Sequence, residues 1–180
     1  MSIEIHSYLS ASFKLSNQPD IADAIVVLDS RSKHTDFVSK NTCRHLYLRF
    51  DDIVSESINQ RIATTEDVSD AIEFAAGSKD LIVCCRAGQS RSAALAVVVA
   101  ASRSLASEML DSLNPKRHVP NARIIELGAR ILSSPELLVS FDRWRAMNRG
   151  IVPSDFVDDI SLEIDSLEAR GATDLISISR

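Results

Sequence analysis

The chain has 180 residues, of which 45% are hydrophobic and 25% charged, and its formal net charge is −5. These values are typical of one soluble globular domain that buries a core without a disulfide or metal staple. The negative net charge arises in residues 151–180, where seven acidic residues accompany two arginines, whereas residues 1–150 carry equal numbers of acidic and basic residues. This balance argues against the strongly basic surface of a nucleic-acid-binding protein.

Short apolar runs in the first half of the chain predict the strands of a sheet. A weakly alternating stretch at residues 3–9 predicts an edge strand. Three stronger runs predict buried strands, at residues 24–28 (AIVVL), 45–50 (HLYLRF) and 81–84 (LIVC).

Helices are predicted between the last two strands and after them. Thr65 is the predicted cap of a helix that ends near Ala76, with Gly77 as its stop. Strand, helix and strand in this order predict a βαβ unit. Four further helices are predicted over residues 92–102, 105–113, 121–132 and from 135 onward. The order predicts an α/β fold in which helices cover a small, mostly parallel central sheet of four to five strands.

The sequence shows no targeting or membrane-spanning pattern. Its first residues lack a basic stretch followed by an apolar run. The longest apolar run, at residues 93–101, is half the length needed to cross a bilayer. We therefore expect a cytoplasmic protein without a membrane or nucleic-acid partner.

Residues 81–92 (LIVCCRAGQSRS) carry most of the chemical information. Cys85 and Arg91 are separated by five residues with Gly88 in the middle, and Ser92 follows the arginine, a combination that chance supplies in roughly one in a thousand such sequences. A loop entering a helix directs backbone N–H groups at a common centre and binds anions. Arg91 adds a planar fork for two phosphate oxygens. The predicted substrate-binding residues are Arg86, Ala87, Gly88, Gln89, Ser90 and Arg91.

Cys85 is the predicted nucleophile, since the donors of this loop and Arg91 favour its thiolate form. Ser92 is placed to donate a hydrogen bond to the sulfur and ease its departure. The alternative is a small buried cysteine at the end of a strand.

Displacing an alcohol or phenol from phosphate also needs a proton donor on the far side of the phosphorus. Asp51 and Asp52 follow the strand at residues 45–50, at the same sheet edge as Cys85 if the two strands are parallel. Either aspartate can fill this role. We favour Asp52, and we expect the other to be a turn or cap residue.

The segment CRAGQSRS resembles the signature loop of the cysteine-dependent protein tyrosine phosphatases and is most similar to the dual-specificity branch. Asp52, 33 residues before Cys85, matches the acid of that branch. FDDI and LNPKRHVPN also look like a group of compact predicted tyrosine phosphatases. The resemblance covers about residues 20–148 and implies a phosphatase-like fold and hydrolysis through a phosphocysteine without a metal or other cofactor. We expect a catalytic domain over residues 1–150 and an acidic helix or tail over 151–180, because Gly150 and Pro153 mark a joint before the acidic segment. The resemblance would place Asn114 and Asn121 behind the loop, where we interpret them as a helix stop and an N-cap.

Cys84 departs from the family pattern, which usually has histidine before the nucleophile. The family's histidine helps to activate the thiol, so activation of Cys85 is expected to be weaker here. We interpret Cys84 as an inert buried residue in preference to one half of a strained disulfide with Cys85.

The resemblance implies a phosphorylated protein as substrate, through phosphotyrosine and also phosphoserine or phosphothreonine. One alternative is a phosphate-recognition module with little turnover. Another is a phosphatase of a small non-protein phosphomonoester, which we rank lower because the loop carries Arg86 as its one additional basic residue.

Overall fold

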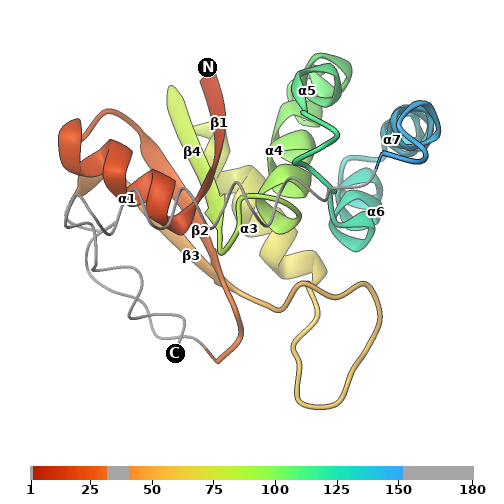
Figure 1. The fold of residues 1–180 in the computed structure, drawn as a ribbon, viewed down its shortest axis with the longest axis horizontal. Coiled ribbons are helices and arrows are strands. Elements are labelled where there is room, and N and C mark those ends of the chain that lie inside the picture. Colours follow the sequence, from red (N-terminus) through yellow and green to blue (C-terminus); the bar gives the residue numbers. More distant parts are fainter. Residues whose placement is uncertain (1, 32–40, 152–180) are drawn as a thin grey trace.

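The computed structural model describes residues 2–31 and 41–151. Their sheet has four strands in the order β1-β4-β2-β3, and every pairing is parallel (Figure 1). The prediction of a small parallel α/β sheet is confirmed with four strands. The strands are β1 (Ser2–Ser7), β2 (Asp23–Leu28), β3 (His45–Arg49) and β4 (Asp80–Cys85).

The first helix, α1 (Tyr8–Asn17), is absent from the sequence prediction. The predicted edge strand over residues 3–9 ends earlier, because Ser7 caps this helix by accepting the N–H of Ser10 at 3.1 Å. Ser12 lies buried among the apolar residues of α1 and interrupts its apolar stripe. The interruption hides the helical period from the sequence.

The other helices begin and end within a residue or two of the predicted ranges. One detail of the prediction is wrong, since the N-cap of α3 is Thr64 and not Thr65. Thr64 Oγ1 accepts the N–H of Asp67 at 3.3 Å, and the Asp67 carboxylate accepts the N–H of Thr64 at 2.9 Å, which is a capping box. The helices are α3 (Thr65–Ala76), α4 (Arg91–Ala101), α5 (Ala106–Ser112), α6 (Ala122–Ile131) and α7 (Pro135–Met147).

Helices cover both faces of the sheet. α1 packs on one face, and α3 to α7 lie on the other (Figure 1). Successive residues of a strand point to opposite faces, so Cys84 joins the core beneath α1 while Cys85 faces α4. A disulfide between them would require the end of β4 to unwind. Burial also raises the pKa of the Cys84 thiol, and we therefore interpret Cys84 as a core residue.

Because the sheet is parallel, its strands end at one edge. Asp29 follows β2, residues 50–52 follow β3, and the loop of residues 86–90 follows β4. The loop after β3 is gold in Figure 1 and projects below the sheet. This edge is where ligands of open parallel sheets bind. None of the helices within residues 2–31 and 41–151 is long and apolar enough to cross a bilayer. Apart from Ile151, the predicted acidic tail lies outside the described residues.

Candidate active site

The loop of residues 86–90 joins the buried end of β4 to the first turn of α4. The first N–H groups of a helix have no intrahelical acceptor and, with the helix dipole, attract anions. Ser90 occupies the N-cap position, but its side chain does not cap α4. Its hydroxyl instead donates to Asp52 at 2.8 Å. No side chain at the N-cap therefore competes with an anion for the start of α4.

Gly88 gives this loop its tight shape. Its φ of +68° lies in the left-handed region that favours glycine. A Cβ at this position would lie 2.6 Å from the backbone nitrogen of Ser7 and 2.7 Å from the carbonyl carbon of His6. The loop thus packs directly against the junction of β1 and α1, and a side chain at Gly88 would push it away.

Replacing Gly88 with alanine is expected to destabilise the protein and weaken oxyanion binding. The left-handed backbone costs about 1–2 kcal/mol for alanine, and the contact with rigid backbone adds about 1–3 kcal/mol. Gly150→Ala is the matched control, because Gly150 also has a positive φ, of +93°, but no atom of the described residues lies within 4 Å of the added Cβ. Denaturant unfolding of both variants measures the difference. Equal losses in the two variants would contradict this role for Gly88.

Cys85 lies at the floor of the site. Cys85 is 2% exposed, and its Sγ lies 3.1 Å from the hydroxyl oxygen of Ser92 in the first turn of α4. When the sulfur is a thiolate, Ser92 is the donor of this hydrogen bond. Ser92 is fully buried, so its hydroxyl acts on the sulfur from beneath the loop.

Arg91 is buried, and its guanidinium group contacts acceptors from the ends of two strands. Its Nη1 donates to the carbonyl oxygen of Phe50 at 2.7 Å, and its Nη2 pairs with Asp29 Oδ1 at 2.7 Å. Burial by itself would lower the pKa of Arg91, but the negative charges of Cys85 and Asp29 raise it. The Nε atom is buried and has no hydrogen-bond partner among the described residues; it lies 4.0 Å from Asp52 Oδ2. A buried guanidinium nitrogen without a partner is suited to a ligand oxygen.

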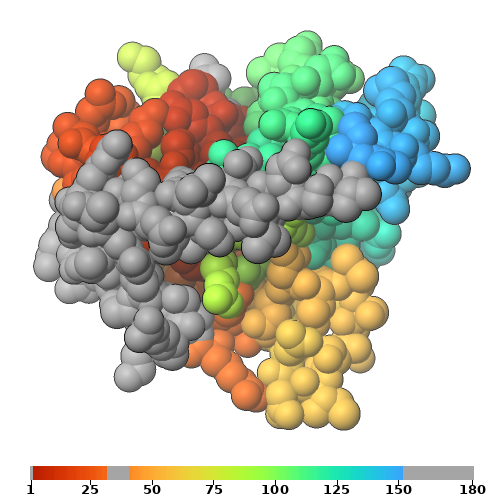
Figure 2. All heavy atoms as spheres, in the orientation of Figure 1, coloured from red at the N-terminus to blue at the C-terminus, as the bar shows by residue number. Residues whose placement is uncertain are grey.

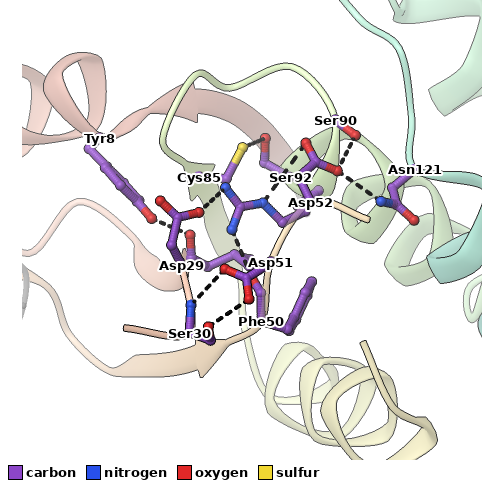
Figure 3. Close-up of polar contacts among 12 residues, drawn as sticks. Tyr8, Asp29, Ser30, Phe50, Asp51, Asp52, Cys85, Ser90, Ser92 and Asn121 are labelled. Carbon is purple, nitrogen blue, oxygen red and sulfur yellow. Dashed lines mark hydrogen bonds and ion pairs between the residues drawn. The ribbon is translucent and has the colours of Figure 1, made fainter. Parts of the chain in front are cut away.

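Asp52 lies beside this guanidinium and is held by two donors. Its Oδ1 accepts hydrogen bonds from the Ser90 hydroxyl and from Asn121 Nδ2, each at 2.8 Å, as Figure 3 shows. Its side chain is 39% exposed, so it can exchange a proton with bound substrate or water. Asn121 also caps α6, since its Oδ1 accepts the N–H of Ile124 at 3.3 Å. This contact agrees with the interpretation of Asn121 as an N-cap. The hydrogen bond from Asn121 to Asp52 was not predicted from the sequence.

Asp51 has a different environment from its neighbour. Its carboxylate accepts the N–H and hydroxyl of Ser30 at 3.1 and 2.6 Å and the N–H of Arg61 at 2.7 Å. Burial alone would raise the pKa of Asp51, but these hydrogen bonds, led by that of Ser30, lower it. The Asp51 N–H also donates to the Arg61 carbonyl at 2.7 Å. Asp51 and Arg61 therefore hold together the two ends of the loop that carries Asp52.

Cys85, Arg91, Asp52 and Asp51 line one cavity of about 460 Å³, which we call the cradle cavity. Of the predicted substrate-binding residues, Gly88 is not part of its lining, because it turns toward β1. Ser92 also lies outside the lining, beneath Cys85. The lining residues are Asp29, Asp51, Asp52, Gln60, Cys85, Arg86, Ala87, Gln89, Ser90 and Arg91.

Sequence reasoning missed two polar contacts of this site. Asp29 directly follows β2 and pairs with Arg91, and the signal was available, because it ends a buried strand just as Asp51 and Asp52 do. The contact between Asn121 and Asp52 had no local signal. Asn114 accepts the N–H of Lys116 at 3.0 Å in the turn after α5, which agrees with its interpretation as a helix stop.

No family model and no curated protein matches the chain. Among solved structures it is similar to a crystal structure described as Tk-PTP in the active form, with a TM-score of 0.49 and 16% identity, over 73% of this chain and 90% of that one. It is also similar to the Yvh1 phosphatase domain from Chaetomium thermophilum, with a TM-score of 0.38 and 14% identity, over 83% of this chain and 92% of that one. The second is described as a phosphatase domain. Identities and TM-scores are low in both cases, so a function for this chain depends on the geometry of its own site.

Proposed function

We propose that the chain is a phosphomonoester hydrolase that acts through a phosphocysteine and accepts phosphorylated tyrosine, with serine and threonine as further candidates. The observation that supports this most directly is the convergence of three groups on the cradle cavity: the Cys85 sulfur, the buried Arg91 guanidinium, whose Nε has no hydrogen-bond partner among the described residues, and the Asp52 carboxyl group. A nucleophile, an anion-binding fork and a proton carrier at one cavity are the groups that phosphoryl transfer needs.

The proposed first step is attack of the Cys85 thiolate on phosphorus. The bond between phosphorus and the leaving oxygen breaks, and Asp52, protonated at this stage, gives its proton to that oxygen. The N–H groups of the loop and Arg91 bind the three equatorial oxygens, where they stabilise the charge of the transition state. The products of this step are a free alcohol or phenol and phosphocysteine.

The proposed second step is hydrolysis of the phosphocysteine. The Asp52 carboxylate takes a proton from water as the water oxygen attacks phosphorus. The bond between phosphorus and sulfur breaks, and Cys85 leaves as the thiolate. Ser92 donates its hydrogen bond to that sulfur and lowers the free energy of the leaving thiolate. Asp52 is again protonated, so the cycle closes without a further reactant.

The test is phosphate release from p-nitrophenyl phosphate by the full chain, with and without vanadate. We expect turnover, and inhibition by vanadate because it adopts the five-coordinate geometry of the transition state. A phosphate-recognition module would bind vanadate or inorganic phosphate without releasing nitrophenol. Binding without turnover would therefore contradict the proposal and support that alternative.

A further inference from the structure

A second cavity of about 800 Å³, the flanking groove, lies next to the cradle cavity. Asp52, Gln60, Gln89 and Ser90 line both cavities. One wall of the groove is the loop that follows β3, and the other is the segment of residues 119–122 that leads into α6. In Figure 2 the loop after β3 (gold) projects beside the lime-coloured loop after β4. A substrate whose phosphate occupies the cradle would extend directly into this groove.

Both walls carry exposed apolar side chains. Val54 is 59% exposed on the loop after β3, and Val119 is 47% exposed on the opposite wall. Exposed aliphatic side chains that gather in a concave site are typical of a binding surface. Their burial against an apolar partner would contribute to binding, at about 25 cal/mol for each Å² removed from water.

Both walls are fixed relative to the cradle. The N–H of Val119 donates to the carbonyl oxygen of Gln89 at 3.2 Å, which ties the second wall to the phosphate loop. Two hydrogen bonds between Asp51 and Arg61 hold together the ends of the loop that forms the first wall. The groove is thus built on the same loops that hold the candidate catalytic groups, and these loops keep the two cavities side by side.

The charges of the groove do not favour a second anionic group. Among the described residues, Arg145 is the one basic residue in its lining, and Glu56 offsets its charge. With Asp52 protonated when substrate binds, the lining is close to neutral and offers no excess positive charge to the additional phosphates of an inositol polyphosphate or a nucleotide. Ser55 and Ser57 supply neutral groups that can bind backbone amides. This chemistry fits a peptide and not a polyphosphate.

We infer that the flanking groove binds the peptide segment next to the phosphorylated residue and selects an apolar side chain there. The inference rests on the proposed phosphatase function and assigns a specificity role to Val54 and Val119. A small aryl phosphate has no atoms that reach the groove beyond the shared wall. Its turnover reports the cradle alone, whereas turnover of a phosphopeptide reports the cradle and the groove together.

The experiment compares three substrates: p-nitrophenyl phosphate, a phosphotyrosine peptide with leucine on both sides of the phosphotyrosine, and the same peptide with serine at those positions. We expect the full chain to prefer the leucine peptide by about 10-fold or more in kcat/KM, the scale for burying an aliphatic side chain. The double variant Val54→Ser, Val119→Ser should reduce this preference by about 3- to 10-fold through KM. It should leave p-nitrophenyl phosphate turnover unchanged.

Val139→Ser is the matched control, because Val139 is 60% exposed on α7 and lines neither cavity. It should change none of the three rates. Equal turnover of both peptides, or a leucine preference that survives the double variant, would overturn the groove assignment while p-nitrophenyl phosphate turnover keeps the proposed function intact. Faster hydrolysis of an inositol phosphate than of the leucine peptide would also overturn it. Absence of all turnover would overturn the proposed function, and this inference with it.

Discussion

Cys85→Ser is expected to abolish turnover of an aryl phosphate while leaving oxyanion binding largely intact. The cradle cavity contains no other thiol among its lining residues, and Cys84 faces the opposite side of the sheet. A serine hydroxyl at this position stays protonated near neutral pH, since no base contacts it in the described part of the chain. The expected fall in kcat is on the order of 10⁶, the scale observed when a covalent hydrolase loses its nucleophile.

Two measurements check this expectation. Nitrophenol release gives the rate, and calorimetric titration with tungstate, an unreactive oxyanion, gives the affinity of the cradle. Cys43→Ser is the matched control, because Cys43 is exposed and contacts the carbonyl oxygen of Asp20 instead of the site. Its activity should equal that of the unmodified chain. A Cys85→Ser protein that binds tungstate and retains turnover would contradict the role of Cys85.

Asp52→Asn is expected to slow hydrolysis of an alkyl phosphate by roughly 10² to 10⁴, the usual contribution of general acid–base catalysis. Aryl phosphates should be slowed less, because their leaving groups need less help from a proton. Asparagine keeps the shape of aspartate and an oxygen that accepts hydrogen bonds from Ser90 and Asn121. The loss should therefore report proton transfer and not a displaced loop. Rates with one alkyl and one aryl substrate provide the measurement.

Asp51→Asn separates the two neighbouring carboxylates. We expect a small effect on the alkyl-to-aryl rate ratio, but a loss of about 1–3 kcal/mol in the free energy of unfolding at neutral pH, because charge-assisted hydrogen bonds to Ser30 and Arg61 are weakened. The pKa of Asp51 is lower in the folded state than in the unfolded state. The ionised carboxylate therefore stabilises the fold at pH values above the unfolded-state pKa. This stabilisation is lost as the pH falls through the folded-state pKa. The stability difference between the two proteins should thus shrink in acid. A larger loss of alkyl phosphatase activity in Asp51→Asn than in Asp52→Asn would reassign the acid role.

The parts of the site that local sequence patterns predict are those that lie close together in the chain. Cys85, Gly88, Arg91 and Ser92 belong to one strand–loop–helix segment whose shape follows from its own residues. Asp52 required a further step, the argument that parallel strands end at one edge, and the structure brings its Oδ2 to 4.0 Å from Arg91 Nε.

Contacts between distant segments could not be predicted in the same way. Asn121 meets Asp52 across 69 residues, and no periodicity specifies which side chain a helix cap will also contact. Asp29 had a signal, but its pairing with Arg91 depends on the order of β2 and β4 in the sheet. Helix α1 was missed because a buried serine breaks its apolar stripe, and burial of Ser12 is a property of the assembled fold.

The most direct test of the proposed mechanism is the identity of the atom that becomes phosphorylated during turnover. An aryl phosphate with a good leaving group makes the first step fast, so the covalent intermediate accumulates and nitrophenol appears in a burst. Quenching the reaction in acid during that burst, followed by peptide mapping by mass spectrometry, locates the phosphoryl group. The proposed mechanism predicts that the phosphoryl group is on the sulfur of Cys85 and that it is absent from the Cys85→Ser protein. A phosphoryl group on another residue, or turnover with no burst and no phosphorylated chain, would contradict it.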